Sequence, residues 1–311
     1  MTEDAAGVRL DRFVAERMPD ASRSRVSAWI RDGRVTIDGV PERPSRRLVV
    51  GQEVTVAPPA PTPTTVTPQE MPLNVVFEDA DLIVVDKPAG VVVHPGAGNP
   101  DGTLLNGLLH RYGELSSIGA PARPGVVHRI DAGTSGLLVF ARTDEAHLHL
   151  AAQFSDHSAH RRYHALAWGF RMDDEGTIRT HYARHAKDRR KFTSLVDGGK
   201  RAVTHWTVLE RLPPCTWLAL QLETGRTHQI RVHLAERGQA LVGDATYGGR
   251  RKENHNNRLR PLGWELGLGR QALHAAELGF VHPRTGERMM FTSDLPDDIA
   301  GLLALLREIH Q

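Results

Sequence analysis

The chain has 311 residues, of which 40% are hydrophobic and 24% charged, and its formal net charge at pH 7 is +2. This length predicts roughly two domains, and the composition excludes general disorder. The single cysteine, Cys215, excludes intramolecular disulfides and Cys-rich metal sites and is typical of a reducing compartment. No segment reaches the ~18 apolar residues of a membrane span, and residues 1–4 do not begin a secretory signal. We therefore expect a cytoplasmic protein with no membrane partner.

Residues 1–57 are predicted to form a small α+β module. Apolar residues spaced i, i+3 and i+4 predict two short helices, through residues 10–14 and 26–30. A serine at 22 or 24 caps the second helix, and Gly33 ends it. The dipeptide Asp38-Gly39 predicts a tight hairpin turn. The predicted strands of the module are residues 35–37, 40 and 54–56.

A proline-rich segment separates this module from the rest of the chain. The prolines stand at positions 58, 59, 61, 63, 68 and 72. Because proline at this density continues neither a helix nor a central strand, residues 58–72 are predicted to form an extended, semi-rigid linker. The second domain then comprises residues 73–311.

In the second domain, short apolar runs alternate with glycine-rich turns. The strand-like runs are residues 82–85, 137–140, 217–220 and 277–280. Helices are predicted from Asp144 to about His157 and from Arg226 to Arg237. Strands and helices do not alternate in a βαβ pattern, so the sequence predicts an α+β fold on a mixed, largely antiparallel sheet with flanking helices, rather than a Rossmann fold.

Arginines gather around the second helix of the first module. They are Arg23, Arg25, Arg31 and Arg34. Acidic residues nearly balance them, so charge alone also fits an ordinary solvated helix face. The order of residues is more specific, because Ser24-Arg25, Ile30 and the pattern Gly33-x-Val35-x-Ile37-x-Gly39 resemble the S4 RNA-binding module. S4 modules dock this helix on structured RNA. Asp38 replaces the usual Asn of that family and still suits the turn.

A second group of polar residues lies in the loop over 124–136, directly before a predicted buried strand. His128, Arg129 and Asp131 stand there among glycines, at a strand mouth where functional sites are often built. A lone loop aspartate is more often an Asx-turn or a cap. The loop contains no GxxxxGK[ST] pattern, which excludes a phosphate-binding P-loop.

The segment HRIDAGTSGLLVFART (residues 128–143) closely resembles the central motif of the RluA/RluD-type pseudouridine synthases, H-R-[LI]-D-x-x-T-S-G. Further segments resemble the motifs of this family in the same order along the chain. They are residues 85–95, 102–106, 162–166, 222–233, 243–248 and 273–275. The resemblance covers essentially residues 9–295 and includes the S4 module. It implies an isomerase that converts uridines in RNA, most of all in 23S large-subunit ribosomal RNA, to pseudouridine.

The resemblance also implies roles for individual residues. Asp131 matches the catalytic aspartate; whether it attacks covalently or acts on the sugar stays open. Arg231 matches the arginine that pairs with this aspartate, and Tyr163 matches the tyrosine that stacks on the target base. Arg129 matches the arginine that occupies the space left by the extruded nucleotide. Two further substrate-binding residues are expected at Ile230 and His128, and for His128 loop support is an equal alternative.

The isomerisation oxidises nothing and transfers no phosphate, so we expect no cofactor and no metal. The spacing of His147 and His149 is tempting for a metal site, but the two lie on different helix faces. The basic stretch over 179–201 is interpreted as an arm that contacts RNA phosphates, with a charged surface loop as the alternative. Its candidate RNA-binding residues are Arg189, Arg190 and Lys191.

Two other functions were weighed against the isomerase. The first is a non-catalytic S4-type RNA-binding or ribosome assembly factor with a degenerate synthase domain, which the presence of Asp131, Tyr163 and Arg231 disfavours. The second is a nucleosidase or glycosidase, which would use a second carboxylate. We therefore predict a monomeric pseudouridine synthase whose partner is ribosomal RNA or a pre-ribosomal particle.

Overall fold

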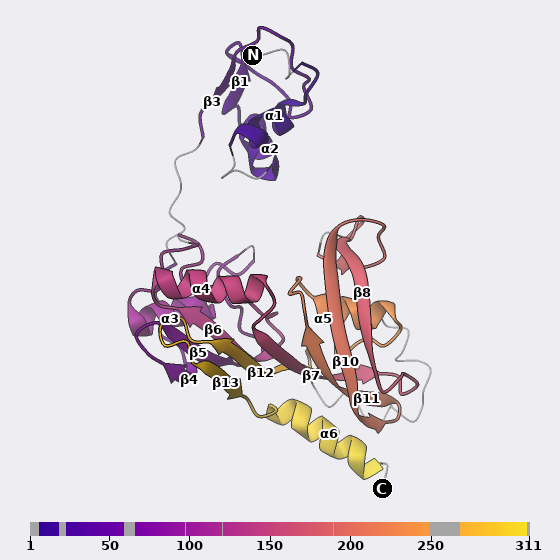
Figure 1. Ribbon diagram of the computed structural model, residues 1–311. Helices are drawn as coiled ribbons and strands as arrows, with labels where there is room; N and C mark the ends of the chain where they lie inside the picture. The colour runs from indigo at the N-terminus through magenta and orange to yellow at the C-terminus, as the bar shows by residue number, and fades with distance from the viewer. Residues whose placement is uncertain are drawn as a thin grey trace. The chain divides into compact units, whose positions relative to one another are not determined.

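The computed structural model describes residues 6–18, 23–58, 66–96, 98–119, 121–188, 190–248 and 268–309; the side chains of Ser24 and Arg25 are not described. The contacts of the chain divide it into two units, Met1–Thr64 and Thr65–Gln311 (Figure 1). No helix of the described part combines the length and the apolar character that crossing a membrane requires.

The first unit packs two helices against a small sheet. Its helices are α1 (Leu10–Arg17) and α2 (Arg23–Arg31), and its antiparallel strands follow the order β2 (Val40–Pro41), β1 (Val35–Ile37) and β3 (Val54–Val56). Apolar side chains from all of these elements except β2 form one core. Asp38 and Gly39 have positive φ angles of 51° and 79°, as the hairpin turn requires. The predicted helices, hairpin and last strand are confirmed.

The second unit is built on a ten-stranded mixed sheet (Figure 1). Along the sheet the strands are β4 (Asn74–Glu78), β5 (Leu82–Lys87), β6 (Ser135–Ala141), β12 (Leu273–Val281), β7 (His160–Trp168), β11 (Cys215–Leu222), β10 (Lys200–Leu212), β8 (Glu175–Arg184) and β9 (Phe192–Thr193), with β13 (Arg288–Thr292) paired to β12. Only β6 and β12 run parallel among the described strand pairs. The predicted α+β class, its largely antiparallel sheet and the four predicted strand segments are confirmed.

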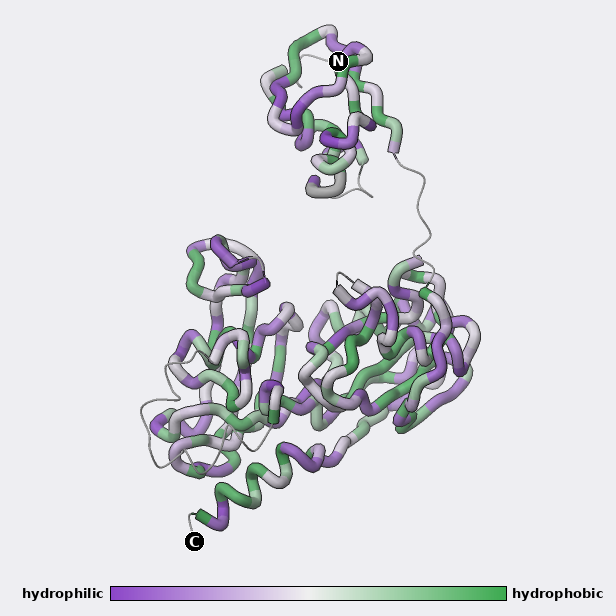
Figure 2. The backbone as a smooth tube through the Cα atoms, turned by 180° about the vertical axis from the view of Figure 1, so that it is seen from behind, coloured by the Kyte–Doolittle hydropathy of each residue, from purple (hydrophilic) through white to green (hydrophobic). Residues whose placement is uncertain are grey.

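Helices cover both faces of the β5–β6 part of the sheet. Alternate residues of these strands pack against α3 (Leu104–Tyr112) on one face and against α4 (Asp144–Ser155) on the other. The residues of β5 and β6 are therefore apolar on both sides, and their sequences read as continuous apolar runs. Figure 2 shows these hydrophobic stretches in the strands, while hydrophilic residues are more frequent in the connections.

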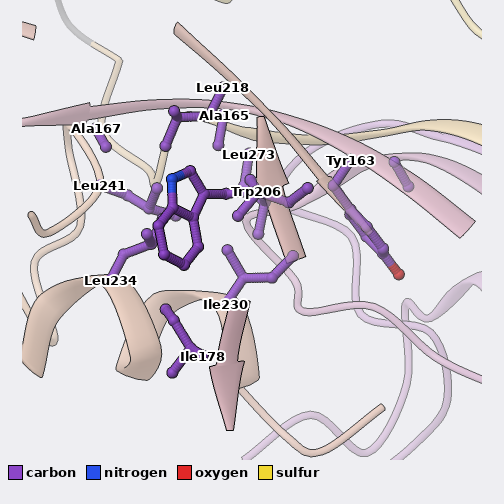
Figure 3. Packing of buried hydrophobic residues seen from close by; sticks show 12 residues of the cluster. Tyr163, Ala165, Ala167, Ile178, Trp206, Leu218, Ile230, Leu234, Leu241 and Leu273 are labelled. Atoms are coloured by element: carbon purple, nitrogen blue, oxygen red, sulfur yellow. The ribbon is translucent and has the colours of Figure 1, made fainter. Parts of the chain in front are cut away.

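Two further helices complete the unit. Helix α5 (Gln229–Glu236) packs beside β10 around Trp206 (Figure 3), and α6 (Asp297–Ile309) packs its apolar side near Trp217. The sequence did not predict α3 or α6. The prediction that α5 starts at Arg226 is wrong, because His228 adopts a left-handed conformation with φ 60° and the helix begins after it.

The basic stretch over 179–201 is only partly a loop. Its first residues belong to β8 and its last two to β10, and these strands pair directly. The alternative of a charged surface loop therefore applies only to the connection over 185–199, which also contains the short strand β9.

Candidate active site

Asp131 lies in the loop before β6 and lines a pocket of about 390 Å³. The backbone of this loop is held at consecutive residues. The Ala132 carbonyl oxygen accepts hydrogen bonds from Lys87 Nζ (3.0 Å) and from the Gly90 N–H (2.8 Å). The Gly133 carbonyl oxygen accepts from Arg270 Nη1 at 3.0 Å. Because the backbone is fixed on several sides, the direction of the Asp131 side chain is fixed as well.

Lys87 is a fully buried lysine beneath this loop. Its Nζ donates to the carbonyl oxygens of Pro88 (2.7 Å) and Ala132 (3.0 Å). Burial, together with the positive charge of Arg270, lowers the pKa of Lys87 to about 7. A neutral amine has two N–H groups, and two carbonyl oxygens receive them. The buried amine therefore needs no carboxylate partner to support the loop.

Arg231 connects Asp131 to a second carboxylate, Asp244. Its Nη1 donates to Asp131 Oδ2 at 3.0 Å, while its Nε and Nη2 donate to the two Asp244 oxygens at 2.7 and 3.0 Å. The side chains of Asp244 and Arg231 are 0% and 8% exposed, whereas that of Asp131 is 21% exposed. Asp244 thus fixes the guanidinium, and Arg231 presents one donor to an aspartate that opens into the pocket.

The charges of this trio are mutually stabilised. Burial alone would raise the pKa of Asp244, but the hydrogen bonds and charge of Arg231 lower it. Burial opposes the charge of Arg231 too, and the two carboxylates raise its pKa above its ordinary value. Asp244 also accepts from the N–H groups of Thr246 and Tyr247, so its oxygens are engaged within the protein. Asp244 is therefore a positioning residue and not a free second acid.

His228 stands on the other side of Asp131. Its Nε2 lies 3.8 Å from Asp131 Oδ1, and its Nδ1 lies 2.9 Å from the Tyr247 hydroxyl. Burial lowers the pKa of His228, so the ring is neutral at pH 7. The Tyr247 hydroxyl accepts from the Phe192 N–H, which leaves its proton for Nδ1 of His228. The neutral ring then carries its own proton on Nε2, toward Asp131.

Tyr163 and Ile230 form an apolar wall of the pocket. Both are buried, 7% and 4% exposed, and both line the pocket. Figure 3 shows the Tyr163 ring at the side of the apolar cluster, with its hydroxyl directed away from Trp206. Burial raises the pKa of Tyr163, so its hydroxyl keeps its proton at neutral pH. The wall offers a flat aromatic face on which a base can stack.

Arg129 and His128 differ in exposure. Arg129 is exposed at the pocket, and its Nη2 donates to Thr227 Oγ1 at 2.8 Å. His128 accepts a hydrogen bond on Nε2 from the Val139 N–H (3.0 Å), and its ring stacks on Phe154. Burial lowers the pKa of His128 to about 3, which keeps the ring neutral. Its geometry fits support of the loop better than proton transfer.

Gln229 organises the turn that brings Arg231 to the site. Its Oε1 accepts from Thr224 Oγ1 (2.7 Å) and from the Arg226 N–H (3.0 Å), and its Nε2 donates to the Val203 carbonyl oxygen (3.0 Å). These bonds tie the turn before α5 to β10. Our sequence interpretation did not assign site roles to Gln229, His228, Asp244 or Lys87, although all of them stand in segments that resemble family motifs.

The predicted RNA-binding arginines of the first unit lie on its surface. Arg23, Arg31 and Arg34 are exposed, and Arg23 also pairs with the buried Asp11 at 3.0 Å. The Arg25 side chain lies outside the described residues. In the second unit, Arg190 pairs with Asp188 and is 88% exposed, and Lys191 is half-buried. Arg189 lies outside the described residues.

Of the two histidines considered as metal ligands, His149 has its Nδ1 3.0 Å from Nε2 of Gln153, and His147 is buried. A different group, Asp79, Asp81 and His282, has its ligand atoms within 4.8 Å of one another. In that group His282 bonds Asp79, and Arg284 forms an ion pair with Asp81, so both carboxylates already have partners within the protein.

Comparison with known proteins covers both units. A family model described as RNA pseudouridylate synthase matches residues 81–236, and an S4 domain model matches residues 8–54. The ribosomal large subunit pseudouridine synthase D of Zymomonas mobilis is 46% identical over 310 residues, which cover 98% of this chain and 96% of that protein. The uncharacterized RNA pseudouridine synthase YlyB of Bacillus subtilis is 43% identical over 99% of this chain and 97% of its own. A solved human structure, RNA pseudouridylate synthase domain containing 1, has a similar fold, with a TM-score of 0.55 at 24% identity over 76% of this chain and 95% of that chain.

Proposed function

The chain belongs to the RNA pseudouridylate synthase family, and on that premise we propose that it isomerises specific uridines of 23S large-subunit ribosomal RNA to pseudouridine, with Asp131 as the catalytic carboxylate. The observation that carries this proposal is the Asp131–Arg231 ion pair at the wall of the pocket. The choice of RNA rests on the names of relatives that match nearly the whole chain.

The reaction breaks the N1–C1′ bond of uridine, rotates the base and joins C5 to C1′. It needs an ionised carboxylate beside the sugar or the base. The guanidinium of Arg231 donates to Asp131 Oδ2 at 3.0 Å, which orients the carboxylate in the pocket. The chain therefore offers this reaction a carboxylate that is oriented before the substrate arrives.

The protein must both bind the extruded base and fill the space that the base leaves in the RNA. A uridine in structured RNA must leave its stack, at a cost of about a few kcal/mol, before it meets Asp131. The Tyr163 ring and Ile230 receive the extruded base, and the exposed Arg129 at the pocket fills the vacated space by stacking. Because the Tyr163 hydroxyl is protonated at neutral pH, it serves as a hydrogen-bonding group or proton relay and not as a phenolate base.

The remaining parts of the chain contribute binding. In this proposal residues 1–57 form the S4-type RNA-binding domain, residues 58–72 the linker and residues 73–311 the catalytic domain. In this proposal the predicted RNA-binding residues contact RNA phosphates: Arg23, Arg25, Arg31, Arg34, Arg189, Arg190 and Lys191. The protein works as a monomer in the cytoplasm, where ribosomal RNA is available to it.

The experiment uses large-subunit ribosomal RNA transcribed in vitro with uridine tritiated at C5. Formation of pseudouridine releases this tritium into water. We expect release by the natural protein and none above background by Asp131→Asn, which keeps the size of the side chain and removes its charge. Asp101→Asn, at an exposed position, is the matched control and should release tritium normally. Equal release by the natural protein and Asp131→Asn would refute the assignment of Asp131.

A further inference from the structure

Arg161 lies in the active-site pocket and is unused by the chemistry above. It precedes Tyr163 by two residues on β7, so the two side chains point to the same face of the sheet. Both residues line the pocket, and Arg161 is only 7% exposed. The positive charge of an arginine is permanent, so a cation is held in the pocket wall beside the stacking tyrosine.

Arg161 has few partners for its charge. Its Nη2 lies 3.4 Å from the carbonyl oxygens of Leu222 and Glu223, longer than the usual ~2.7–3.2 Å of such bonds. Its Nε is buried and has no hydrogen-bond partner in the described part of the chain, and its guanidinium packs 5.4 Å from the Phe154 ring. Among the residues that the structure describes, no carboxylate forms an ion pair with Arg161.

A comparison with Arg231 shows that a buried arginine without an ion pair is unusual in this protein. Arg161 and Arg231 are the buried arginines of the described part of the chain, and each is 7% exposed. Arg231 lies between two carboxylates, Asp131 and Asp244, whereas the described residues provide none for Arg161. Burying a charge without a counter-charge is costly, and such groups cluster at functional sites where a ligand completes them. The missing anion is therefore expected from the substrate.

The neighbouring loop leaves room around the guanidinium. A Cβ atom at position 225 would lie 2.9 Å from Nη1 of Arg161, so Gly225 keeps this space open. Gly225 and Arg226 line the pocket beside Arg161. Nη1 donates no hydrogen bond to any residue that the structure describes. This donor thus borders the pocket beside Gly225.

We propose that Arg161 binds a phosphate group that adjoins the extruded uridine. The proposal rests on the proposed function, in which Tyr163 stacks on the base and Asp131 acts at the sugar or the base. The phosphate is the remaining part of the nucleotide and the only part with a permanent negative charge. The planar guanidinium matches phosphate oxygens in geometry and charge. Arg161 is therefore a substrate-binding residue that holds the nucleotide in the pocket after it leaves its stack.

The first test compares Arg161→Gln with Arg162→Gln on tritiated large-subunit ribosomal RNA at several salt concentrations. Arg162 is the matched control because it is the next residue on β7, points to the opposite face and pairs with Glu277. We expect Arg161→Gln to lower kcat/KM about 10- to 100-fold and to reduce the salt slope of RNA binding by about one contact. Arg161→Lys should retain the slope. An unchanged slope in Arg161→Gln overturns the proposal, even if the variant is less stable.

The second test removes the charge from the RNA. Once the modified uridine is mapped, short RNAs carry a neutral methylphosphonate on its 5′ or its 3′ side, and their binding is measured. At one of these positions the methylphosphonate should weaken RNA binding by the natural protein. The same methylphosphonate should not weaken RNA binding by Arg161→Gln any further. Independent, additive losses at both positions overturn the proposal. A natural protein that binds the unaltered, tritiated ribosomal RNA but releases no tritium would instead refute the proposed function.

Discussion

The arginines of the pocket and those of the first unit differ in what surrounds them. Arg231 is almost fully buried and lies between Asp131 and Asp244, whereas Arg31 and Arg34 are exposed on the first unit. A buried, hydrogen-bonded charge fixes geometry, and its removal leaves other charges unpaired. An exposed charge attracts RNA and is screened by salt. The same residue type therefore supports chemistry in one region and affinity in the other.

The sharpest test of this contrast is Arg231→Met. It leaves Asp131 and the buried Asp244 without their partner, so the free energy of unfolding should fall by about 3–5 kcal/mol, and tritium release should be lost. Arg31→Met, on the first unit, should change stability by less than about 0.5 kcal/mol. Urea unfolding and tritium release measure both variants. Comparable losses of stability in the two variants would contradict the distinction.

Lys87 is a buried amine whose effect on stability should depend on pH. Its pKa is about 7 in the folded protein and near 10.5 in an unfolded chain, so between these values the unfolded chain binds the extra proton. The contribution of Lys87 to stability therefore rises with pH, by about 2 kcal/mol from pH 7 to pH 9. Urea unfolding at several pH values should show this rise in the natural protein and its loss in Lys87→Met. A rise that persists in Lys87→Met would assign it to another group.

Tyr163 tests the aromatic wall of the pocket. Tyr163→Leu removes the stacking face and should lower kcat/KM for tritium release by about 10- to 100-fold, since stacking contributes about 1–3 kcal/mol per base. Tyr163→Phe keeps the face and loses only the hydroxyl. If the two variants were equally impaired, the hydroxyl and not the ring would be the important group.

The smallest expected effect is at the exposed arginines. Replacing Arg31 and Arg34 together by Gln should weaken RNA binding and reduce its salt slope by about two contacts, while kcat at saturating RNA stays unchanged. Filter binding between low and physiological salt measures the slope. A fall in kcat with an unchanged slope would show that these side chains do not act through phosphate contacts.

Local sequence patterns predicted most of the elements that are marked by a single signal, such as an apolar run or a turn dipeptide. The apolar runs of β5 and β6 and the Asp38-Gly39 turn are examples, because burial and turn chemistry there depend on near neighbours. Helix α3 was missed because it contains a glycine at position 107, and glycine is a weak helix former. The start of α5 was misplaced because helical periodicity does not reveal that His228 takes a left-handed conformation.

The sequence by itself determined the family resemblance, the fold class and the identity of the candidate carboxylate, because these depend on ordered motifs and local periodicity. Only the tertiary structure decided which charges meet. Arg231 reaches Asp131 across 100 residues of sequence, and Lys87 supports the same loop across 45. Only the fold leaves Arg161 buried with no carboxylate partner among the described residues. Such pairings depend on which strands lie side by side, and strand order is a property of the whole sheet that no local pattern encodes.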